Sequence, residues 1–365
     1  MTDALTVSAG RLPALPNVTA RRAALARLPK VELHRHLTGS IRLDTMLELD
    51  AEYGLDLPTR DREELRRHAQ VGPDTPAELA HILRTVSAFL RRCFVSREAI
   101  ARIAHEMVED AAEDGIVYLE ARFSPLYMAQ TSRVSPEQAF EAAAEGLAEA
   151  SARFGIRTGV LIALAREAGL SACQRAADLA LEHAGELVVG VDLAGDEAGH
   201  PPRLFTRIFD KLRADGRLGI TVHAGEASGP QSVRDAIELL GAQRIGHGVR
   251  AVHDPQVVEL VRARGVVLET CPTSNVLTGA VPSLAEHPLR ALLEAGVRAT
   301  INTDDPGWFD VTLTDEYATA LDQLGLSFAE LTTAALNAAH GAFLPADERA
   351  ALARQLEAAY GQAGL

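Results

Sequence analysis

Apolar residues recur along the chain in short runs of strand length, separated by stretches with helical periodicity. Many of these runs are rich in β-branched residues, which is typical of buried parallel strands. The segments between them, such as 135–155 and 171–185, repeat apolar residues at helical spacing and end at a glycine that suits a helix terminus. Eight strands are predicted, at residues 31–37, 116–124, 156–164, 186–195, 219–226, 244–249, 265–272 and 297–305.

Strand and helix alternate through most of the chain, which indicates parallel strands joined by right-handed crossovers. Eight such units favour a closed (β/α)8 barrel, with an open doubly wound sheet as the alternative. Residues 38–112 are too long for one crossover helix, so we interpret them as a helical insertion over the barrel mouth. The domain is expected to span residues 29–365, after an N-terminal arm at 1–28.

Charge and composition narrow the class of function. The 365 residues include 50 acidic and 36 basic ones, a formal net charge of −14. Nucleic acids and anionic membranes repel such a protein, so we expect neither as a partner. No secretory signal or membrane-span pattern is visible, and three scattered cysteines indicate no disulfide framework. We therefore predict a cytoplasmic enzyme that acts on a small molecule, and leave its oligomeric state open.

The letters HAGE occur twice, around His183 and around His223. In a barrel of this type the active site gathers at the carboxyl ends of the strands, whereas the opposite face mainly contributes stability. His183 ends a predicted helix and precedes a strand, while His223 ends a strand and opens a loop. Only the second copy is therefore predicted to be functional.

Ionisable residues follow several other predicted strands. Two histidines separated by one residue on a strand point to the same side, which suits two ligands of one metal, although a pair of surface histidines is the alternative for HRH alone. An adjacent aspartate pair at the end of an apolar strand requires a cation or a specific donor. The residues that converge on this rim are His34, His36, Gly195, Asp196, Glu197, His223, Glu226, His247, Asp304 and Asp305.

Three histidines and one carboxylate at strand ends suit Zn²⁺ with one open coordination position. Both lysines, Lys30 and Lys211, precede predicted strands, so neither can bridge two metals at a strand end as a carbamylated lysine. We therefore favour one zinc ion per chain, although a carboxylate bridge between two metals is not excluded. A zinc site built from paired cysteines is not predicted, because TCPTS contains only one cysteine.

Five motifs in this order resemble the adenosine deaminase family of zinc aminohydrolases: PKVELHRHLTGS, DLAGDE, TVHAGE, RIGHG and NTDDP. The resemblance runs from Pro29 to the end of the barrel. It implies a (β/α)8 fold, one catalytic Zn²⁺ and hydrolytic removal of the 6-amino group from an aminopurine. It also implies that His34, His36, His223 and Asp304 are the metal ligands.

The resemblance implies further roles for the rim. Glu226 protonates N1 of the purine, His247 orients the attacking water and Asp304 accepts its proton. Asp305 contacts N7 of the purine, and the backbone N–H of Gly195 contacts N3. Protonation of N1 makes C6 a better electrophile, so Glu226 must be a neutral acid with a raised pKa. Thr38 and His36 are assigned to the substrate side of the site.

One position departs from the family pattern. Where adenosine deaminases read HxHLDG, this chain reads HRHLTG, with Thr38 in place of the aspartate that is expected to hold the 5′-hydroxyl. The expected substrate is therefore adenosine or a 5′-modified adenosine such as 6-amino-6-deoxyfutalosine of menaquinone synthesis. The benzoate of 6-amino-6-deoxyfutalosine could pair with one of several arginines, Arg35, Arg84, Arg91 or Arg92. Adenine and N6-modified AMP are the alternative substrates.

Two hypotheses from other functional classes remain. A non-catalytic metal-binding or ligand-binding barrel is disfavoured because the predicted acid and all four predicted ligands are present. A hydrolase of cyclic amides or phosphoesters also uses HxH, but DLAGDE and the glutamate three residues after His223 count against it.

Overall fold

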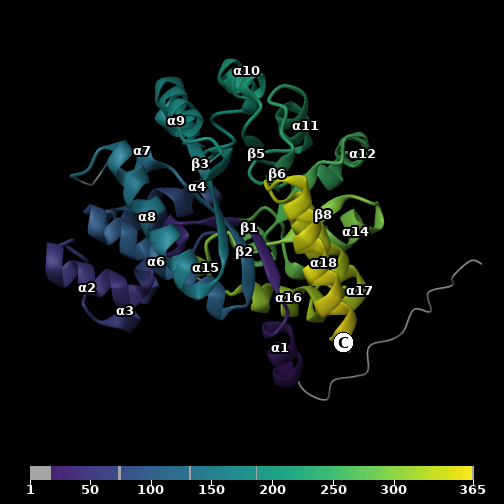
Figure 1. Cartoon of the computed structure of the whole chain (residues 1–365), viewed down its shortest axis with the longest axis horizontal. Coiled ribbons are helices and arrows are strands. Elements are labelled where there is room, and N and C mark those ends of the chain that lie inside the picture. Colours follow the sequence, from purple (N-terminus) through teal and green to yellow (C-terminus); the bar gives the residue numbers. More distant parts are fainter. Residues whose placement is uncertain (1–17, 73–74, 131–132, 186, 364–365) are drawn as a thin grey trace, which may run out of the picture.

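The computed structural model describes residues 18–72, 75–130, 133–185 and 187–363. Eight parallel strands form one sheet in sequence order, so all eight predicted strands are present and the barrel is confirmed (Figure 1). Residues 1–17 of the predicted arm lie outside the described residues. The strands are β1 (Lys30–His36), β2 (Ile116–Phe123), β3 (Arg157–Ala165), β4 (Val188–Ala194), β5 (Gly219–Ala224), β6 (Arg244–His247), β7 (Val267–Thr270) and β8 (Arg298–Ile301).

The barrel closes between the end of β8 and β1. The residue Asp304 donates its N–H to the carbonyl of His34 at 2.9 Å and accepts from the N–H of His36 at 2.8 Å. An isolated parallel bridge pairs Arg35 with Asp304. Because these bonds join residues at the strand ends, closure of the barrel also sets two histidines beside an aspartate.

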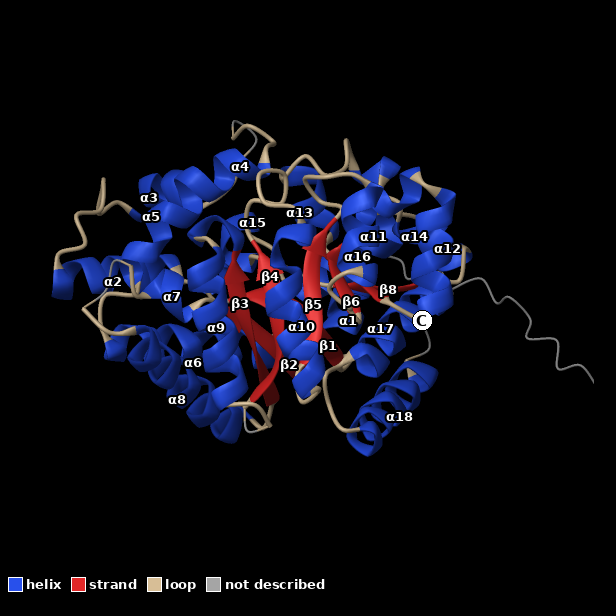
Figure 2. Ribbon diagram, turned by 90° about the horizontal axis from the view of Figure 1, so that it is seen from above, coloured by secondary structure: helices blue, strands red, loops and turns tan. Residues whose placement is uncertain are grey.

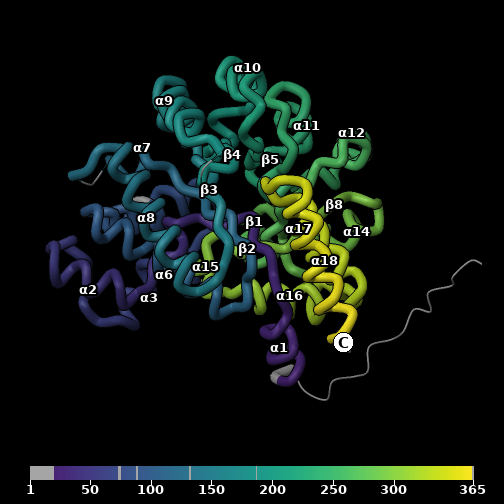
Figure 3. Tube along the Cα trace, viewed as in Figure 1, coloured from purple at the N-terminus to yellow at the C-terminus, as the bar shows by residue number. Residues whose placement is uncertain are grey.

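An outer ring of helices covers the strands, with at least one helix between each pair of neighbouring strands (Figures 2 and 3). Local sequence explains several of their ends. Capping boxes begin α8 at Ser135 and α17 at Ser327, and left-handed glycines end α8, α10 and α12. The ring contains α6 (Arg97–Glu113), α8 (Pro136–Phe154), α9 (Leu170–Glu182), α10 (Thr206–Asp215), α11 (Pro230–Glu238), α12 (Pro255–Arg264), α14 (Leu289–Glu294) and α17 (Phe328–Gly341).

The segment between β1 and β2 is helical, and α2, α3 and α5 gather at one side of the barrel (Figure 2). Its last helix, α6, packs along α8 and against β2, so this part of the segment belongs to the outer ring. The additional elements are η1 (Thr38–Ser40), α2 (Leu43–Tyr53), α3 (Arg62–Ala69), α4 (Leu79–Ile82), the π-helix η2 (Leu83–Ser87), α5 (Ala88–Leu90) and η3 (Arg91–Cys93).

Short elements at the strand ends and two flanking helices complete the fold. Among the described residues, no helix combines the length and apolar composition needed to cross a bilayer. These elements are α1 (Val18–Ala26), α7 (Pro125–Met128), η4 (Arg166–Ala168), η5 (Pro202–Phe205), η6 (Val249–His253), α13 (Pro272–Leu277), η7 (Leu284–Glu286), α15 (Pro306–Phe309), α16 (Leu313–Asp322) and α18 (Ala346–Gln362).

Candidate active site

One cavity lies at the carboxyl ends of the strands and brings the predicted site residues together. Its empty volume is about 830 Å³, including its opening to solvent. Leu79, Ile82 and Leu83 from the segment between β1 and β2 form an apolar part of its wall. Its polar and glycine lining comprises His36, Thr38, Ser87, Ser124, Tyr127, Glu167, Gly195, His223, Glu226, His247, Thr278, Asp304 and Asp305.

Three of these side chains and the buried His34 behind them form a compact group that could hold a metal ion. His34 and His36 come from β1, His223 from β5 and Asp304 from the loop after β8, and their ligand atoms all lie within 4.8 Å of one another. Asp304 Oδ1 is 3.2 Å from His34 Nε2 and 3.3 Å from His36 Nε2. The predicted ligand set is therefore assembled in space, although its residues are up to 270 positions apart in the sequence.

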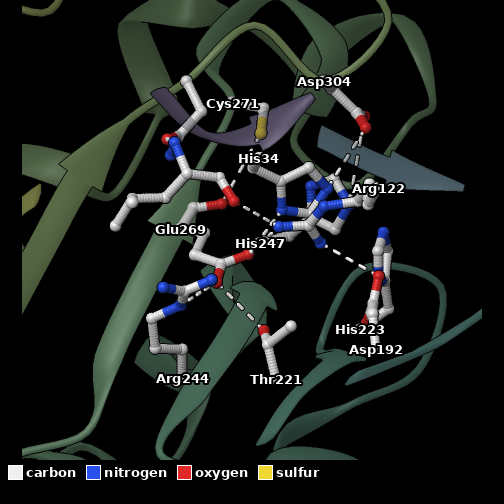
Figure 4. A network of polar contacts seen from close by, with 12 residues as sticks. His34, Arg122, Asp192, Thr221, His223, Arg244, His247, Glu269, Cys271 and Asp304 are labelled. Carbon is white, nitrogen blue, oxygen red and sulfur yellow. Dashed lines mark hydrogen bonds and ion pairs between the residues drawn. The ribbon is translucent and has the colours of Figure 1, made fainter. Parts of the chain in front are cut away.

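Buried carboxylates fix the orientation of two of the imidazoles. Glu269 Oε2 lies 2.7 Å from His34 Nδ1, and Asp192 Oδ1 lies 3.0 Å from His223 Nδ1 (Figure 4). An imidazole that donates from Nδ1 to a carboxylate presents Nε2 as its ligand atom, which is the usual arrangement around protein-bound zinc. His34 Nε2 is buried and forms no hydrogen bond. The donor set and this unsatisfied nitrogen therefore fit a zinc ion.

Two buried arginines hold the carboxylates of Asp192 and Glu269 in place. Arg122 donates to Asp192 at 3.0 Å and to Glu269 at 2.8 Å, while Arg244 donates to Glu269 at 2.6 Å (Figure 4). These arginines outweigh the effect of burial and hold the pKa of Glu269 well below its usual range. Asp192 and Glu269 therefore stay ionised and can keep accepting from the two histidines. Arg122 orders the site from within the barrel.

Glu226 combines deep burial with a carboxyl oxygen that has no partner. Its side chain is only 4% exposed, and Oε1 forms no hydrogen bond. Burial, followed by the negative charge of Asp304, raises the pKa of Glu226 to about 8. Its backbone is held by Glu197, whose carboxylate accepts N–H bonds from four consecutive residues, 225–228, at 2.7–3.2 Å. Glu226 can therefore present a neutral acid to a ligand in the cavity.

His247 sits next to Glu226, and a chain of hydrogen bonds defines its tautomer. Asn275 Oδ1 accepts the backbone N–H of Cys271 at 3.2 Å, so the amide nitrogen of Asn275 faces His247 Nδ1 at 3.0 Å. Nδ1 must then be an acceptor, which leaves the proton of the neutral ring on Nε2. Nε2 lies 3.4 Å from Glu226 Oε2, and burial lowers the pKa of His247 well below its usual range.

Two of these residues adopt a backbone conformation that side chains other than glycine rarely use. His247 has φ of 62° and Asp304 has φ of 65°. Such left-handed positions are costly and concentrate at functional sites, where neighbouring structure enforces them. Here the enforcing contacts include the bonds from Asp304 to β1 and a 2.7 Å bond from Ser274 Oγ to Asp304 Oδ2.

Asp305 lies at the same end of the barrel beside the 3₁₀ turn η1. Its Oδ1 is buried without a hydrogen-bond partner, and burial followed by the charge of Asp304 raises the pKa of Asp305 well above its usual range. Gly39 makes this contact possible, because a Cβ at position 39 would lie 1.9 Å from Asp305 Oδ1. Asp305 is therefore a second carboxyl group that can donate a proton in a hydrogen bond.

The two HAGE segments are separated as the sequence predicts. His183 follows α9 and packs against Phe140 with ring centroids 4.4 Å apart and ring planes inclined by 35°, while His223 lies near the end of β5 and lines the cavity. Of the arginines considered for an anionic substituent, Arg35 is buried and bonds to Ser40 outside this cavity. Arg91 lies against Tyr127, a residue of the cavity lining, with its guanidinium 4.7 Å from the centre of that ring.

Sequence reasoning missed several polar residues that hold the site. Asp192 bonds to His223, Ser274 to Asp304 and Asn275 to His247. His287 bonds in turn to Asn275. The available signal was the cluster of small polar residues in TCPTSN directly after β7, which has the same strand-end position as the predicted groups. Asp192 lies within the apolar run of β4, where a buried carboxylate also requires a partner.

Comparisons with known proteins identify the family. The sequence profile described as adenosine deaminase matches residues 29–359. An adenosine deaminase of Shigella flexneri is 40% identical over 331 residues, covering 91% of this chain and 98% of the relative. An adenosine deaminase of Klebsiella pneumoniae is 42% identical over 332 residues, covering 90% of this chain and 98% of the relative.

Solved structures agree with the sequence relatives. An adenine deaminase from Arthrobacter aurescens has a TM-score of 0.83 at 28% identity, with 91% of this chain and 98% of that chain covered. An N6-mAMP deaminase from Arabidopsis has a TM-score of 0.80 at 27% identity, with 92% and 99% covered. An amidohydrolase with bound Zn from Burkholderia ambifaria has a TM-score of 0.84 at 28% identity, with 96% and 97% covered. This chain therefore belongs to the adenosine deaminase family, and it is a hydrolytic deaminase acting on C–N bonds.

Proposed function

We propose that this protein is a zinc-dependent deaminase of 6-aminopurine nucleosides. The observation that carries the proposal is the buried acid Glu226, which has a raised pKa and a free oxygen next to the four predicted zinc ligands. Water replaces the 6-amino group in this reaction, giving the 6-oxo purine and ammonia. Bound zinc would lower the pKa of a water molecule so that it can attack carbon near neutral pH.

Each step of this chemistry has a residue that lines the cavity. Neutral Glu226 donates its proton to purine N1, which concentrates the positive charge at C6. His247 donates from Nε2 to the oxygen of the attacking water and orients it. Asp304 accepts the proton that the water loses and passes it to the departing amino group. Asp305, kept neutral by burial, donates to N7, and the N–H of Gly195 donates to N3.

The composition of the cavity favours a nucleoside over a nucleotide. No lysine or arginine occurs among the described residues that line it, whereas four carboxyl groups do: Glu167, Glu226, Asp304 and Asp305. A 5′-phosphate would enter this acidic mouth without a basic partner on the wall, which is unfavourable. N6-modified AMP is therefore the less favoured substrate of this site.

The direct test is ammonia release from adenosine by the zinc-loaded protein. The Glu226→Gln variant should retain zinc and lose at least about 100-fold in kcat, since general acid–base catalysis contributes about 10²–10⁴-fold. Metal content of the purified variant provides the control for an intact site. Full activity of Glu226→Gln would contradict the role proposed for this acid, and absence of turnover with any 6-aminopurine nucleoside would contradict the function.

A 5′-substituted nucleoside is the second candidate substrate, because Thr38 replaces a carboxylate beside the cavity. Leu79, Ile82 and Leu83 offer an apolar wall, which suits the aromatic ring of a substituent such as the benzoate-bearing group of 6-amino-6-deoxyfutalosine. The single negative charge of that group would have to extend beyond the cavity lining to Arg91, whose guanidinium lies 4.7 Å from the centre of the Tyr127 ring. The measurement is the ratio of kcat/KM for 6-amino-6-deoxyfutalosine to that for adenosine.

A ratio above about ten would support the substituted nucleoside, and a ratio below about one tenth would assign adenosine. The Thr38→Asp variant sharpens this test, because it restores a carboxylate that can accept a hydrogen bond from a free 5′-hydroxyl. It should shift the ratio toward adenosine by about tenfold, and it leaves the metal ligands and Glu226 unchanged.

A further inference from the structure

Glu167 is a polar residue of the cavity that the proposed chemistry does not use. It follows β3 in the turn η4, and its exposed side chain lines the cavity mouth. Its Oε2 accepts the backbone N–H of Asp196 at 3.2 Å. The carboxylate of Glu167 also lies directly beside Gly195, because a Cβ added to Gly195 would be 2.1 Å from Glu167 Oε2. Glu167 is therefore held beside the peptide that is proposed to meet purine N3.

The order of strands around the barrel determines where the sugar must lie. The proposed contacts to N7, N1 and N3 come from residues after β8, β5 and β4, in the same order in which these atoms follow one another around the purine. N9 lies between N3 and N7 on the remaining edge. The sugar on N9 must therefore face the ends of β1, β2 and β3, which contribute Thr38, Ser124 and Glu167 to the cavity.

The conformation of the nucleoside then determines which of these strand ends faces the 2′ side of the sugar and which faces the 5′ side. In the anti conformer, C2′ lies on the N3 side of the base and C5′ lies on the C8 side. The N3 side is next to β4 and β3, where Glu167 stands, and the C8 side is next to β8 and β1, where Thr38 stands. A carboxylate is a strong acceptor for a hydroxyl group, so Glu167 matches the 2′-hydroxyl in both position and chemistry.

We infer that Glu167 accepts a hydrogen bond from the ribose 2′-hydroxyl and makes this enzyme selective for ribonucleosides over 2′-deoxyribonucleosides. The inference rests on the proposed function and adds a specificity residue to it. It concerns the 2′ side of the sugar only, so it holds whether or not the 5′ position is substituted.

The test compares kcat/KM for adenosine and 2′-deoxyadenosine in the zinc-loaded protein and in Glu167→Ala. The native enzyme should prefer adenosine by about tenfold or more, and the variant should reduce this preference to less than about threefold, mainly through KM for adenosine. A hydrogen bond to a charged acceptor has an effect of this size. Glu167→Gln should give an intermediate ratio, because its amide oxygen can still accept the bond.

A purely structural role for Glu167 gives a different result. Loss of its bond to Asp196 would disturb the contact to N3, which both nucleosides share, so both rates would fall and their ratio would stay constant. Glu182→Gln, an exposed glutamate at the end of α9, is the matched control and should keep the native ratio. An unchanged ratio in Glu167→Ala overturns the inference alone, whereas deamination of neither nucleoside by the native protein overturns the proposed function as well.

Discussion

At the scale of single residues, Asn275 controls which nitrogen of His247 carries the proton. Its amide donates to Nδ1, and the 3.1 Å contact from His287 Nε2 to Asn275 Oδ1 holds the amide in place. The Asn275→Asp variant would offer an oxygen to Nδ1, move the proton there and leave Nε2 without one. We expect kcat to fall about 10–100-fold, as is usual when a supporting hydrogen bond at a metal site is lost.

The zinc content and thermal stability of Asn275→Asp should stay close to those of the native protein, because the side chain keeps its size. Asn337→Asp is the matched control: Asn337 bonds to the carbonyl of Ala299, away from the cavity. If Asn275→Asp retained native kcat, the tautomer assigned to His247 would be wrong.

At the scale of secondary-structure elements, the turn η1 sets the position of Asp305. A methyl group at Gly39 would lie 1.9 Å from Asp305 Oδ1 and 2.3 Å from its Cβ, so Gly39→Ala must displace that side chain. We expect kcat/KM for the nucleoside to fall at least about tenfold, because one donor to the purine is lost. Zinc content should be retained, since Asp304 is bonded independently to β1.

Gly229→Ala provides the control for this prediction. Gly229 precedes α11, and a Cβ at this position would meet nothing within 4 Å. The two variants make the same chemical change on loops at the same end of the barrel. Equal kcat/KM values in both would show that Asp305 makes no contact that the reaction needs.

The elements themselves were largely predictable from the sequence. Eight runs identified the eight strands because a strand buried on both faces is largely apolar, and the polar residues within them, as in β1, belong to the site or to its support. The strand-end rule then selected His223 over His183 and gathered the predicted ligand set. The bonds that orient this set were not predictable: Asp192 reaches its histidine from the neighbouring strand β4, and Glu269 reaches His34 from β7, two strands away from β1 around the barrel. Sequence periodicity carries no information on such side-chain contacts between strands.

At the scale of the whole molecule, zinc should contribute to folding stability. The proposed ligands join β1, β5 and the end of β8, so the ion would cross-link strands from opposite sides of the barrel. A ligand present at about 1,000 times its Kd stabilises the folded state by about 4 kcal/mol. We expect chelation to lower Tm by at least about 5 °C and added zinc to restore it. The measurement is a thermal melt with and without zinc.

Variants of His36 in β1 and of His183 in the first HAGE segment test whether this shift arises at the proposed site. His36→Ala removes a half-buried ligand and should lose most of the zinc-dependent change in Tm. His183→Ala, at the end of α9, should keep all of it. A native-sized shift in His36→Ala would place the stabilising zinc elsewhere in the protein.

A buried carboxyl group outside the active site should make stability depend on pH. Glu316 in α16 is fully buried and accepts the backbone N–H of Thr273 at 3.0 Å, and burial raises its pKa from 4.5 to about 8. Between these values the folded state holds a proton that the unfolded state has released. The stabilisation is therefore complete below pH 4.5 and is lost as the pH rises through 8.

Glu316→Gln cannot titrate, so its Tm relative to the native protein should rise between pH 5 and pH 8.5. The full difference in pKa sets an upper limit, and we expect a relative gain of about 1–3 kcal/mol in the free energy of unfolding. Thermal or urea unfolding of both proteins across this range measures it, with Glu182→Gln as a control whose exposed side chain should give no such trend. A constant difference between Glu316→Gln and the native protein would mean that Glu316 is ionised throughout. In that case the Thr273 N–H would stabilise the charge more than burial destabilises it.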